Sequence, residues 1–197
     1  MFSGIIEHQA SILARKGWMF RIENTFSDVL KEWQSIAHDG ACMTLTHVTP
    51  EYYEFFSMQE SLSVTNFDTK KVGDTFNVER CLQIGDRIDG HFVSGHIDTV
   101  WKVILVDFQR DGSLLLSISY EPQYDNLLIK KWSVTLNGVS LTIISLNSGS
   151  LTVSLIPLTQ DWTNLWKIKI GETVNIEFDM IGKYIQRLQE NNLQVSK

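Results

Sequence analysis

The sequence has only two cysteines, three prolines and no long apolar run, and each scarcity excludes a class of protein. Three prolines and 12 glycines in 197 residues exclude a collagen-like or low-complexity polymer. Cys42 and Cys81 are too few for a disulfide scaffold, and neither has a second cysteine nearby to form a zinc site, so we expect free thiols. The longest apolar stretches, such as 103–106, fall far short of a bilayer span, and Glu7 and His8 interrupt the N-terminus where a signal peptide is apolar. We therefore expect a cytoplasmic protein with no membrane partner.

Positive charge is also scarce. The chain has 17 Lys and Arg against 23 Asp and Glu, a formal net charge of -6 and a pI near 5.3. Binding to a phosphate backbone needs a basic stripe, which this sequence does not show. Nucleic acid is therefore not an expected partner, whereas 43% hydrophobic residues are enough for a sizeable core in one or two domains.

What the sequence does contain is an internal repeat. Residues 65–79 recur at 163–177, a distance of 98 residues, with seven of 15 positions identical. At the same distance, 35–44 falls on 133–142, so two separate blocks share one register. A repeat in one register predicts tandem duplication of a domain of roughly 90 residues, within the usual size range.

The N-terminal block fixes the domain boundaries. Residues 3–7 resemble 94–98 at a distance of 91 residues, so we expect the second copy to carry seven additional residues in an early loop. This alignment divides the chain into one domain at 1–90, a second at 91–179 and a C-terminal segment at 180–197.

Each copy is predicted to be mainly β-structure. Alternating apolar, β-branched or aromatic residues between turn signals predict strands. Asp39-Gly40 and Asn137-Gly138 are typical of two-residue type I′ turns, in which both residues need positive φ. Short strands at regular spacing favour a barrel. The predicted strands include 43–48, 52–56, 114–120, 141–146 and 151–155.

Two helices are expected. One is a short helix at 26–33, with Ser27 or Asp28 as its N-cap. The other is an amphipathic helix at 180–191, outside the repeat, whose apolar residues recur at helical spacing. That stripe must be buried on its own barrel or against another subunit. It consists of Ile181, Tyr184, Ile185 and Leu188.

Polar residues follow both predicted turns. Alternation places Cys42 and Thr44 on one strand face and Met43 on the other, and the second copy has Ser140 and Thr142 in the matching positions. These groups would give a barrel mouth directional donors and acceptors. The same pattern is also typical of a half-buried strand in which Thr serves β-propensity.

The N-terminal loops differ between the copies. Gly4 and Gly95 lie in extended apolar segments, which indicates either close approach of a ligand or second backbone, or a β-bulge. His96 stands where the first copy has Ile5, and an imidazole titrating near neutrality can move a proton. His91 is a possible partner for it.

Two further residues have a functional and a structural interpretation. Lys131 has no basic counterpart at Trp33 in the first copy, and a solvated surface lysine is the simpler interpretation. Asp179, which aligns with Cys81, lies before the C-terminal helix and could be its N-cap.

Taken together, the blocks at 1–7, 94–98, 137–142 and 171–177 resemble the riboflavin synthase family, the alpha-chain type with two lumazine-binding domains. The resemblance covers essentially the whole chain. It implies an all-β fold of two tandem six-stranded antiparallel Greek-key barrels plus a C-terminal α-helix that assembles a homotrimer, with the active site between subunits.

The resemblance also implies a reaction, the last step of riboflavin biosynthesis. A transferase of this family moves a four-carbon unit between two molecules of 6,7-dimethyl-8-ribityllumazine, giving riboflavin and 5-amino-6-(D-ribitylamino)uracil without a cofactor or a metal. A duplicated domain suits this reaction because each copy can hold one of two identical substrates, and proximity is a large catalytic term.

Carried over to this sequence, the resemblance implies two substrate-binding groups and one catalytic set. The first group comprises Gly4, Ile5, Ile6, Cys42, Met43, Thr44, Phe56, Ser57, Met58, Gln59, Glu60 and Ser61. The second group comprises Gly95, His96, Ile97, Lys131, Ser140, Leu141, Thr142, Ser154, Leu155, Ile156, Pro157, Leu158 and Thr159. The catalytic set comprises His96, Ser140, Thr142, Cys42, Ser35, Lys131 and Asp179, with His96 expected to transfer the proton.

This chain departs from the family pattern at Trp132, where the family usually has Gly, at Phe56, which replaces a more polar residue, and at Ser61, which replaces Thr. Two other functions remain open. Some relatives of the family hold a lumazine or flavin without turning it over, although retention of the site residues favours the enzyme. A flavin reductase barrel is disfavoured because no nicotinamide-binding segment or Gly-rich phosphate loop follows.

Overall fold

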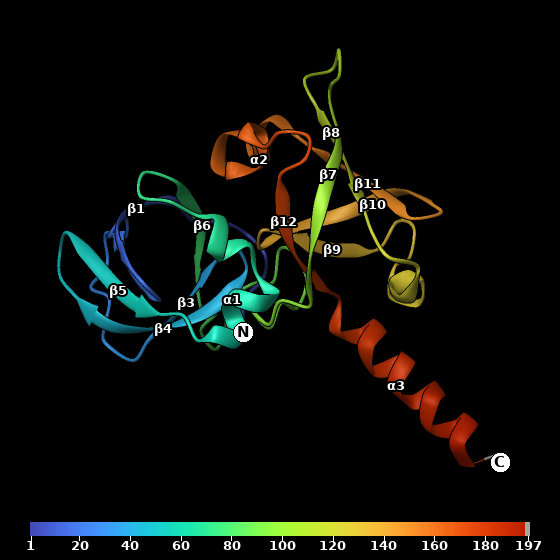
Figure 1. Cartoon of the computed structure of the whole chain (residues 1–197), viewed down its shortest axis with the longest axis horizontal. Helices are drawn as coiled ribbons and strands as arrows, with labels where there is room; N and C mark the ends of the chain where they lie inside the picture. The colour runs from blue at the N-terminus through green and yellow to red at the C-terminus, as the bar shows by residue number, and fades with distance from the viewer. Residues whose placement is uncertain (196–197) are drawn as a thin grey trace.

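The computed structural model describes residues 1–195, which form two closed β-barrels followed by a long helix (Figure 1). The first barrel consists of β1 (His8–Lys16), β2 (Met19–Glu23), β3 (Ser35–His38), β4 (Ala41–Val48), β5 (Tyr52–Phe56) and β6 (Thr75–Arg80). The second consists of β7 (Thr99–Phe108), β8 (Leu114–Ser119), β9 (Ser133–Leu136), β10 (Val139–Asn147), β11 (Ser150–Leu155) and β12 (Thr173–Phe178).

Both barrels have the same topology. The first runs β1-β2-β5-β4-β3-β6 around the barrel, and the second runs β10-β11-β8-β7-β12-β9, with every pair antiparallel. β3, β4 and β5 form a meander and β6 returns beside β3, which is the Greek-key arrangement. The predicted all-β fold of two tandem six-stranded Greek-key barrels with a C-terminal helix is confirmed.

The helices are short except for the last. α1 (Gln59–Val64) and α2 (Pro157–Trp162) follow the fifth strand of each barrel, and each is continued by a 3-10 helix, η1 (Asn66–Thr69) or η3 (Asn164–Lys167). A further 3-10 helix, η2 (Pro122–Leu127), lies in the second barrel, and α3 (Met180–Val195) ends the described chain. Residues 196–197 of the predicted C-terminal segment lie outside the described residues.

The helix expected at 26–33 is wrong: this segment is an irregular crossover between β2 and β3. Phe26 and Leu30 are four residues apart, as on a helix face, but both are buried in the first barrel from a non-helical backbone. The Asn24 side chain accepts from Phe26 N, and Asp28 pairs with Arg80 instead of capping a helix. The matching segment of the second copy contains η2, where proline favours the helical start.

The turns follow the prediction. Asp39 and Gly40 have φ of 42° and 85°, and Asn137 and Gly138 have 46° and 78°, as type I′ turns require. The two turns meet, because a Cβ added to Gly40 would lie 2.8 Å from Gly138 N. Five of the seven additional residues of the second copy lie in the β7–β8 hairpin, which extends beyond the barrel in Figure 1, and the other two lie between β8 and β9, so the expectation of one early loop is only partly right.

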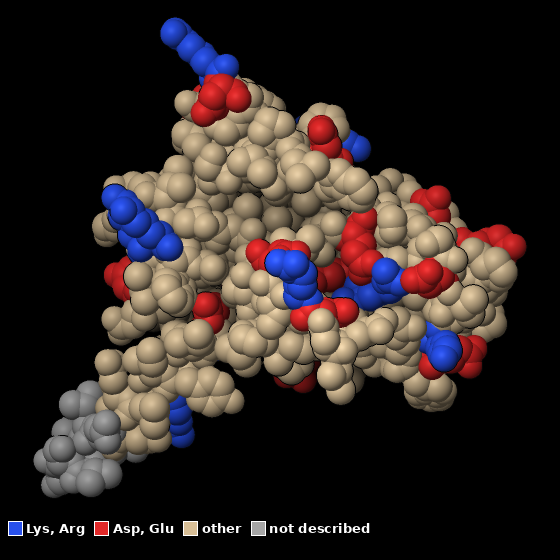
Figure 2. All heavy atoms as spheres, turned by 180° about the vertical axis from the view of Figure 1, so that it is seen from behind, with Lys and Arg blue, Asp and Glu red and all other residues tan. Residues whose placement is uncertain are grey.

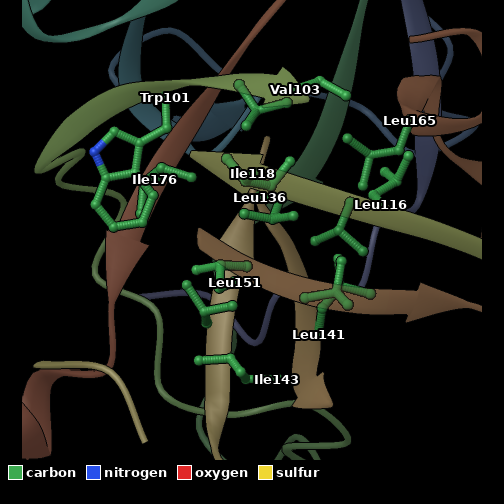
Figure 3. Packing of buried hydrophobic residues seen from close by; sticks show 14 of the residues in the cluster. Trp101, Val103, Leu116, Ile118, Leu136, Leu141, Ile143, Leu151, Leu165 and Ile176 are labelled. Carbon is green, nitrogen blue, oxygen red and sulfur yellow. The ribbon is translucent and has the colours of Figure 1, made fainter. Parts of the chain in front are cut away.

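The two cores occupy the same repeat positions with different side chains. Phe20, Phe55, Phe67 and Phe76 fill the first barrel, with ring centroids of Phe67 and Phe76 4.8 Å apart. The second barrel is filled mainly by Leu, Ile and Val, with Trp101 at one end of the cluster (Figure 3). Burial of these residues supplies most of the favourable free energy of folding.

Four asparagines join the barrels through a reciprocal set of hydrogen bonds. Asn66 N donates to Asn175 Oδ1, and Asn164 N donates to Asn77 Oδ1, both at 2.7 Å. The amide groups continue across the junction, from Asn77 Nδ2 to the Asn137 carbonyl and from Asn175 Nδ2 to the Asp39 carbonyl. The repeated sequence block is therefore the interface between its own two copies.

α3 leaves the second barrel and projects away from both barrels (Figure 1). Asp179 Oδ1 accepts from Ile181 N, which confirms Asp179 as the N-cap. Ile181, Tyr184, Ile185 and Leu188 are between 48% and 68% exposed. The predicted apolar stripe is thus uncovered in the single chain. Over residues 1–195, no helix combines the length and apolarity needed to cross a membrane.

Candidate functional site

The loop that precedes each barrel lies against the other barrel. Gly4, before the first barrel, has φ of 77°, and a Cβ there would lie 2.7 Å from Ser140 Cβ. Gly95, before the second barrel, has φ of 83°, and its Cβ would lie 2.6 Å from Cys42 Cβ. Close approach of a second backbone therefore explains both glycines, and neither lies in a β-bulge.

The isoleucines two residues after these glycines also pack against the opposite barrel. Ile6 is buried in the hydrophobic cluster of the second barrel, whereas Ile97 packs against the cluster of the first. The arrangement differs from the grouping expected from the sequence, in which Gly4 accompanied Cys42 and Gly95 accompanied Ser140. The physical reason is that each loop completes its hydrogen bonds across the barrel junction.

We name the two resulting surfaces by barrel. The first candidate site comprises Cys42, Thr44, residues 56–61 and the loop 95–97. The second candidate site comprises Ser140, Thr142, residues 154–159 and the loop 4–6.

Backbone hydrogen bonds fix the central residue of each candidate site. Cys42 N donates to the Gly95 carbonyl, and Ser140 N donates to the Gly4 carbonyl, both at 2.8 Å. Met43 and Leu141, also expected in the sites, are 6% and 7% exposed and point into the barrel cores. Their side chains therefore do not line the candidate sites.

Both threonines lie on the outer surface of a barrel. Thr44 and Thr142 are exposed on β4 and β10, opposite Ser35 and Ser133 in the ladders. Burial raises the pKa of the Cys42 thiol, and the Ser35 hydroxyl acts in the opposite direction. Cys42 is therefore a thiol at neutral pH, suited to hydrogen bonding more than to nucleophilic attack.

The segments after β5 and β11 run beside these strands. Leu45 pairs with Phe55 and Ile143 with Val153, so 56–58 and 154–156 continue along β4 and β10 toward Thr44 and Thr142. Ser57 and Leu155 are fully buried, and the other segment residues are at least partly exposed. The exposed members are Phe56, Met58, Gln59, Glu60, Ile156, Pro157 and Leu158, and the partly exposed ones are Ser61, Ser154 and Thr159.

The two histidines of the second loop lie in different places. His96 is exposed beside the first candidate site, and its backbone N donates to Ser94 Oγ. His91 is half-buried, and its Nδ1 lies 2.8 Å from Ser140 Oγ in the second candidate site. Burial lowers the pKa of His91, although Asp179 opposes this shift. His91 and His96 therefore belong to opposite sites and do not form a pair.

Lys131 and Asp179 lie near the base of α3. Lys131 is exposed and has φ of 69°, matching the 70° of Trp33 at the same repeat position. Trp132 Nε1 donates to Asp179 Oδ2 at 2.8 Å, and the other Asp179 oxygen caps α3. Both carboxylate oxygens of Asp179 are thus engaged in hydrogen bonds within the chain.

Sequence reasoning missed two buried residues and an aromatic side chain. Glu79 and Glu177 are 4% and 2% exposed and accept hydrogen bonds from the loops at Ser3 and Ser94. Phe2 is fully buried in a small cluster with Ala37 and Val93, and its ring is 2.8 Å from the position of a Cβ on Gly95. The signal was present, because glutamate stands at the same repeat position in both copies.

Charged residues surround the sites without forming a basic patch on the face in Figure 2. There, acidic and basic side chains interleave, and several Lys and Arg lie beside Asp or Glu.

A cavity of about 630 Å³ borders the N-terminal loop at Ser3 and Ile5 and continues over loop residues 82–89. A second, of about 560 Å³, lies at the barrel junction beside Asn66 and Asn164. Of the candidate-site residues, Ile5 lines the first cavity and none lines the second, so the candidate sites are outer barrel surfaces distinct from these hollows.

No group of three metal-ligating side chains comes together within residues 1–195. The available chemistry is that of one exposed imidazole, hydroxyls, a thiol, backbone amides and a lysine. Such a set can bind a polar heterocycle with a polyhydroxylated chain and can transfer a proton.

The two matching barrels, each with a loop against the other, define a protein built by duplication of one β-barrel domain. The lumazine binding domain family matches residues 3–81 and again 94–179. The chain is 35% identical to riboflavin synthase of Bacillus subtilis (strain 168), over 95% of this chain and 89% of that protein. It is 32% identical to riboflavin synthase of Escherichia coli (strain K12), over 91% and 87%. For riboflavin synthase of Schizosaccharomyces pombe (strain 972 / ATCC 24843), the identity is 32% over 98% and 96%.

The chain belongs to the riboflavin synthase family. Solved structures of LumP, complexed with 6,7-dimethyl-8-(1'-D-ribityl) lumazine or with riboflavin, have TM-scores of 0.78 and 0.80. They cover 90% of this chain and 99% of LumP at 20% identity. At this identity the similarity shows the shared fold.

Proposed function

We propose that the chain catalyses the riboflavin synthase reaction, in which two molecules of 6,7-dimethyl-8-ribityllumazine give riboflavin and 5-amino-6-(D-ribitylamino)uracil. The observation that carries this proposal is the duplicated site. Each barrel presents the same combination of a hydrogen-bonded loop, a small polar residue and a threonine two residues later. A reaction between two identical substrates needs two similar sites, and holding both substrates converts a bimolecular step into an effectively unimolecular one.

The residues have separate roles in this proposal. Backbone groups of the loops and of Met43 and Leu141 read the pyrimidine edge of the lumazine. Hydroxyls and Lys131 hold the ribityl chain and the developing anion. One lumazine loses a proton from its acidic methyl group, and His96, exposed on its loop, is the proposed proton-transfer group. Cys42, Ser35, Ser140 and Thr142 are the proposed supporting groups.

Asp179 takes a positioning role here, since both of its oxygens are engaged by Trp132 and α3. The division into domains at 1–90 and 91–179, with 180–197 as a trimerisation segment, remains part of the proposal. The two barrels and the separate α3 support it.

A homotrimer completes the proposal. In the single chain, each candidate site is an open surface, and the stripe of α3 is uncovered. Burying that stripe against other copies would bring the first candidate site of one subunit to the second candidate site of its neighbour. The reaction needs no cofactor or metal, and we place the protein in the cytoplasm. Nucleic acid and membranes are not among the proposed partners.

The decisive experiment gives the purified protein 6,7-dimethyl-8-ribityllumazine alone in the presence of a metal chelator. Substrate and products are followed by chromatography with absorbance detection. We expect one riboflavin for every two lumazines consumed. Tight lumazine binding without product would instead identify a carrier and would contradict the proposal, and Trp132→Gly would then be the first variant to assay.

A further inference from the structure

A buried carboxylate holds the N-terminal loop. Glu79 Oε1 accepts from Ser3 N at 2.7 Å and from Ser3 Oγ at 2.9 Å, while Oε2 accepts from Gly4 N at 3.0 Å. Glu79 is 4% exposed and lies on β6. Three donors on one buried carboxyl group fix the loop, and these hydrogen bonds are shorter and stronger when the group is ionised.

The same arrangement recurs in the second copy. Glu177 Oε1 accepts from Ser94 N and from Ser94 Oγ, both at 2.7 Å, and Oε2 accepts from Gly95 N at 3.0 Å. Glu177 is 2% exposed and lies on β12. Two independent occurrences with the same atoms and nearly the same distances show that this contact is a property of the repeat.

Each loop links its glutamate to the opposite barrel by hydrogen bonds. The amide N–H of Gly95 is held by Glu177, and the Gly95 carbonyl accepts from Cys42 N at 2.8 Å. Likewise, Gly4 N is held by Glu79, and the Gly4 carbonyl accepts from Ser140 N at 2.8 Å. A glutamate of one barrel is therefore connected through two hydrogen bonds to the candidate site of the other barrel.

We infer that Glu79 and Glu177 are positioning residues that each act on the candidate site of the opposite barrel. Glu177 fixes the position of the loop at Gly95 beside Cys42 in the first candidate site, and Glu79 fixes the loop at Gly4 beside Ser140 in the second. The inference rests on the proposed function in assigning substrate to these two surfaces. It goes beyond that function by placing the control of each surface in the opposite barrel.

The surroundings make the two glutamates unequal. Burial raises the pKa of Glu79 to about 7, its bonds to Ser3 and Gly4 oppose this shift, and the neighbouring Glu7 carboxylate adds to it. Burial also raises the pKa of Glu177, but its bonds to Ser94 and the Lys183 ammonium group lower it. Lys183 belongs to α3 and pairs with Asp98 at 2.6 Å, so the C-terminal helix places a positive charge near Glu177.

Amide hydrogen exchange tests the crossing directly. The chain has two cysteines, so 15N-cysteine labelling gives two backbone amide signals, Cys42 and Cys81. Glu177→Gln replaces one acceptor oxygen by an NH2 group that faces the donors. We expect the exchange of Cys42 to become at least about tenfold faster, because a loop held by charge-assisted bonds is released. Glu79 lies in the same barrel as Cys42. Glu79→Gln should therefore leave the exchange rate of the Cys42 amide within about twofold of the wild-type rate.

The chain offers matched controls at one further repeat position. Asp74 and Glu172 each accept a turn N–H, from Lys71 and Lys169, and neither touches the N-terminal loops. Asp74→Asn and Glu172→Gln should leave Cys42 exchange unchanged. If Glu177→Gln fails to fold by circular dichroism, Ser94→Ala removes one donor to Glu177, together with the acceptor of His96 N, and should give a smaller acceleration at Cys42.

Faster Cys42 exchange in Glu79→Gln but not in Glu177→Gln would overturn the inference, and so would equal acceleration in both. With active protein, we also expect kcat/KM for riboflavin formation to fall roughly tenfold in each glutamine variant while both controls stay near the wild-type value. A wild-type protein that binds lumazine without converting it would contradict the proposed function, and the exchange result would still decide the crossing.

Discussion

At the scale of single residues, the two barrels solve the same packing problem with different chemistry. In the first barrel, His38 Nε2 lies 3.0 Å from the Tyr53 hydroxyl, and both side chains are fully buried. The matching residues of the second barrel are Leu136 and Leu151, also fully buried. The first core therefore contains a titratable pair at positions where the second core has two leucines.

This pair predicts that the first barrel is sensitive to acid. Burial lowers the pKa of His38 to about 3, against 6.5 in its ordinary state. Between these two pKa values the unfolded chain binds more protons than the folded chain. The contribution of neutral His38 to the free energy of unfolding is therefore complete above pH 6.5, and it falls by about 1.4 kcal/mol for each pH unit below that value. Denaturant unfolding of His38→Leu/Tyr53→Phe at pH 7.5 and 4.5 should show a much smaller loss than the wild type.

Two comparisons check the origin of that effect. His47→Gln changes an exposed histidine, paired with Glu32, and should keep the wild-type pH dependence. His38→Leu alone should lower the free energy of unfolding by about 1–3 kcal/mol, because it leaves the buried Tyr53 hydroxyl without its partner. An unchanged acid response in the double variant would assign the sensitivity to other groups.

His96 gives a second prediction at this scale. We expect His96→Gln to lower kcat for riboflavin formation strongly, by about 100-fold for loss of a general acid-base group, while lumazine affinity stays nearly constant. The side chain is exposed and makes no part of either core, so folding should not change. Steady-state kinetics with fluorescence titration of lumazine separates the two effects. Wild-type turnover in this variant would remove His96 from the mechanism.

At the scale of elements, sequence periodicity identified the strands well and one helix poorly. The strands 52–56 and 151–155 and the helix beginning at 180 follow from local patterns, and the structure has them within one residue at each start. The segment 26–33 had a helical spacing of apolar residues, but its path is set by burial under the first barrel. Local pattern could not reveal that tertiary contact decides this backbone.

The last helix carries the prediction about assembly. Ile185→Lys/Leu188→Lys places two charges in the stripe of α3, which we propose is buried between subunits. We expect the variant to sediment as a monomer and to lose nearly all riboflavin formation, with unchanged β-sheet circular dichroism. Analytical ultracentrifugation provides the measurement.

Gln186→Lys is the matched control on another face of the same helix, and it should remain trimeric and active. A wild-type chain that sediments as a monomer would contradict the trimer. Full activity in a monomeric Ile185→Lys/Leu188→Lys variant would show that one chain alone can bring two substrates together.

At the scale of the whole molecule, we expect the asparagine junction to couple the unfolding of the two barrels. Asn175 is fully buried and bonds to Asn66 N and to the Asp39 carbonyl across the junction. Asn175→Leu would leave both groups unpaired, at about 1–3 kcal/mol each. In differential scanning calorimetry, we expect one transition for the wild type and two for this variant.

Asn24→Leu is the corresponding control, because the Asn24 amide makes two hydrogen bonds within the first barrel. It should lower the melting temperature without splitting the transition. A single transition in Asn175→Leu would show that other contacts couple the barrels.

The duplication and the barrels could be predicted from the sequence, because a repeat in one register shows itself along the chain. The candidate site residues, named from the repeat and from the family resemblance, stay predictions. The partners of the loops could not be predicted. Gly4 and Cys42 belong to the same copy, yet Gly4 lies against Ser140. A repeat aligns equivalent positions, but it carries no information on which copy supplies a neighbour in space.

The crossed loops also limit how the two halves can diverge. An enlarged residue at position 4 must be accommodated at position 140, and one at position 95 at position 42, since a Cβ already falls within 3 Å in both places. Compensating substitutions among relatives should therefore link the 4–140 and 95–42 pairs more strongly than positions within one half. Since the two copies arose, each half has been part of the selective environment of the other.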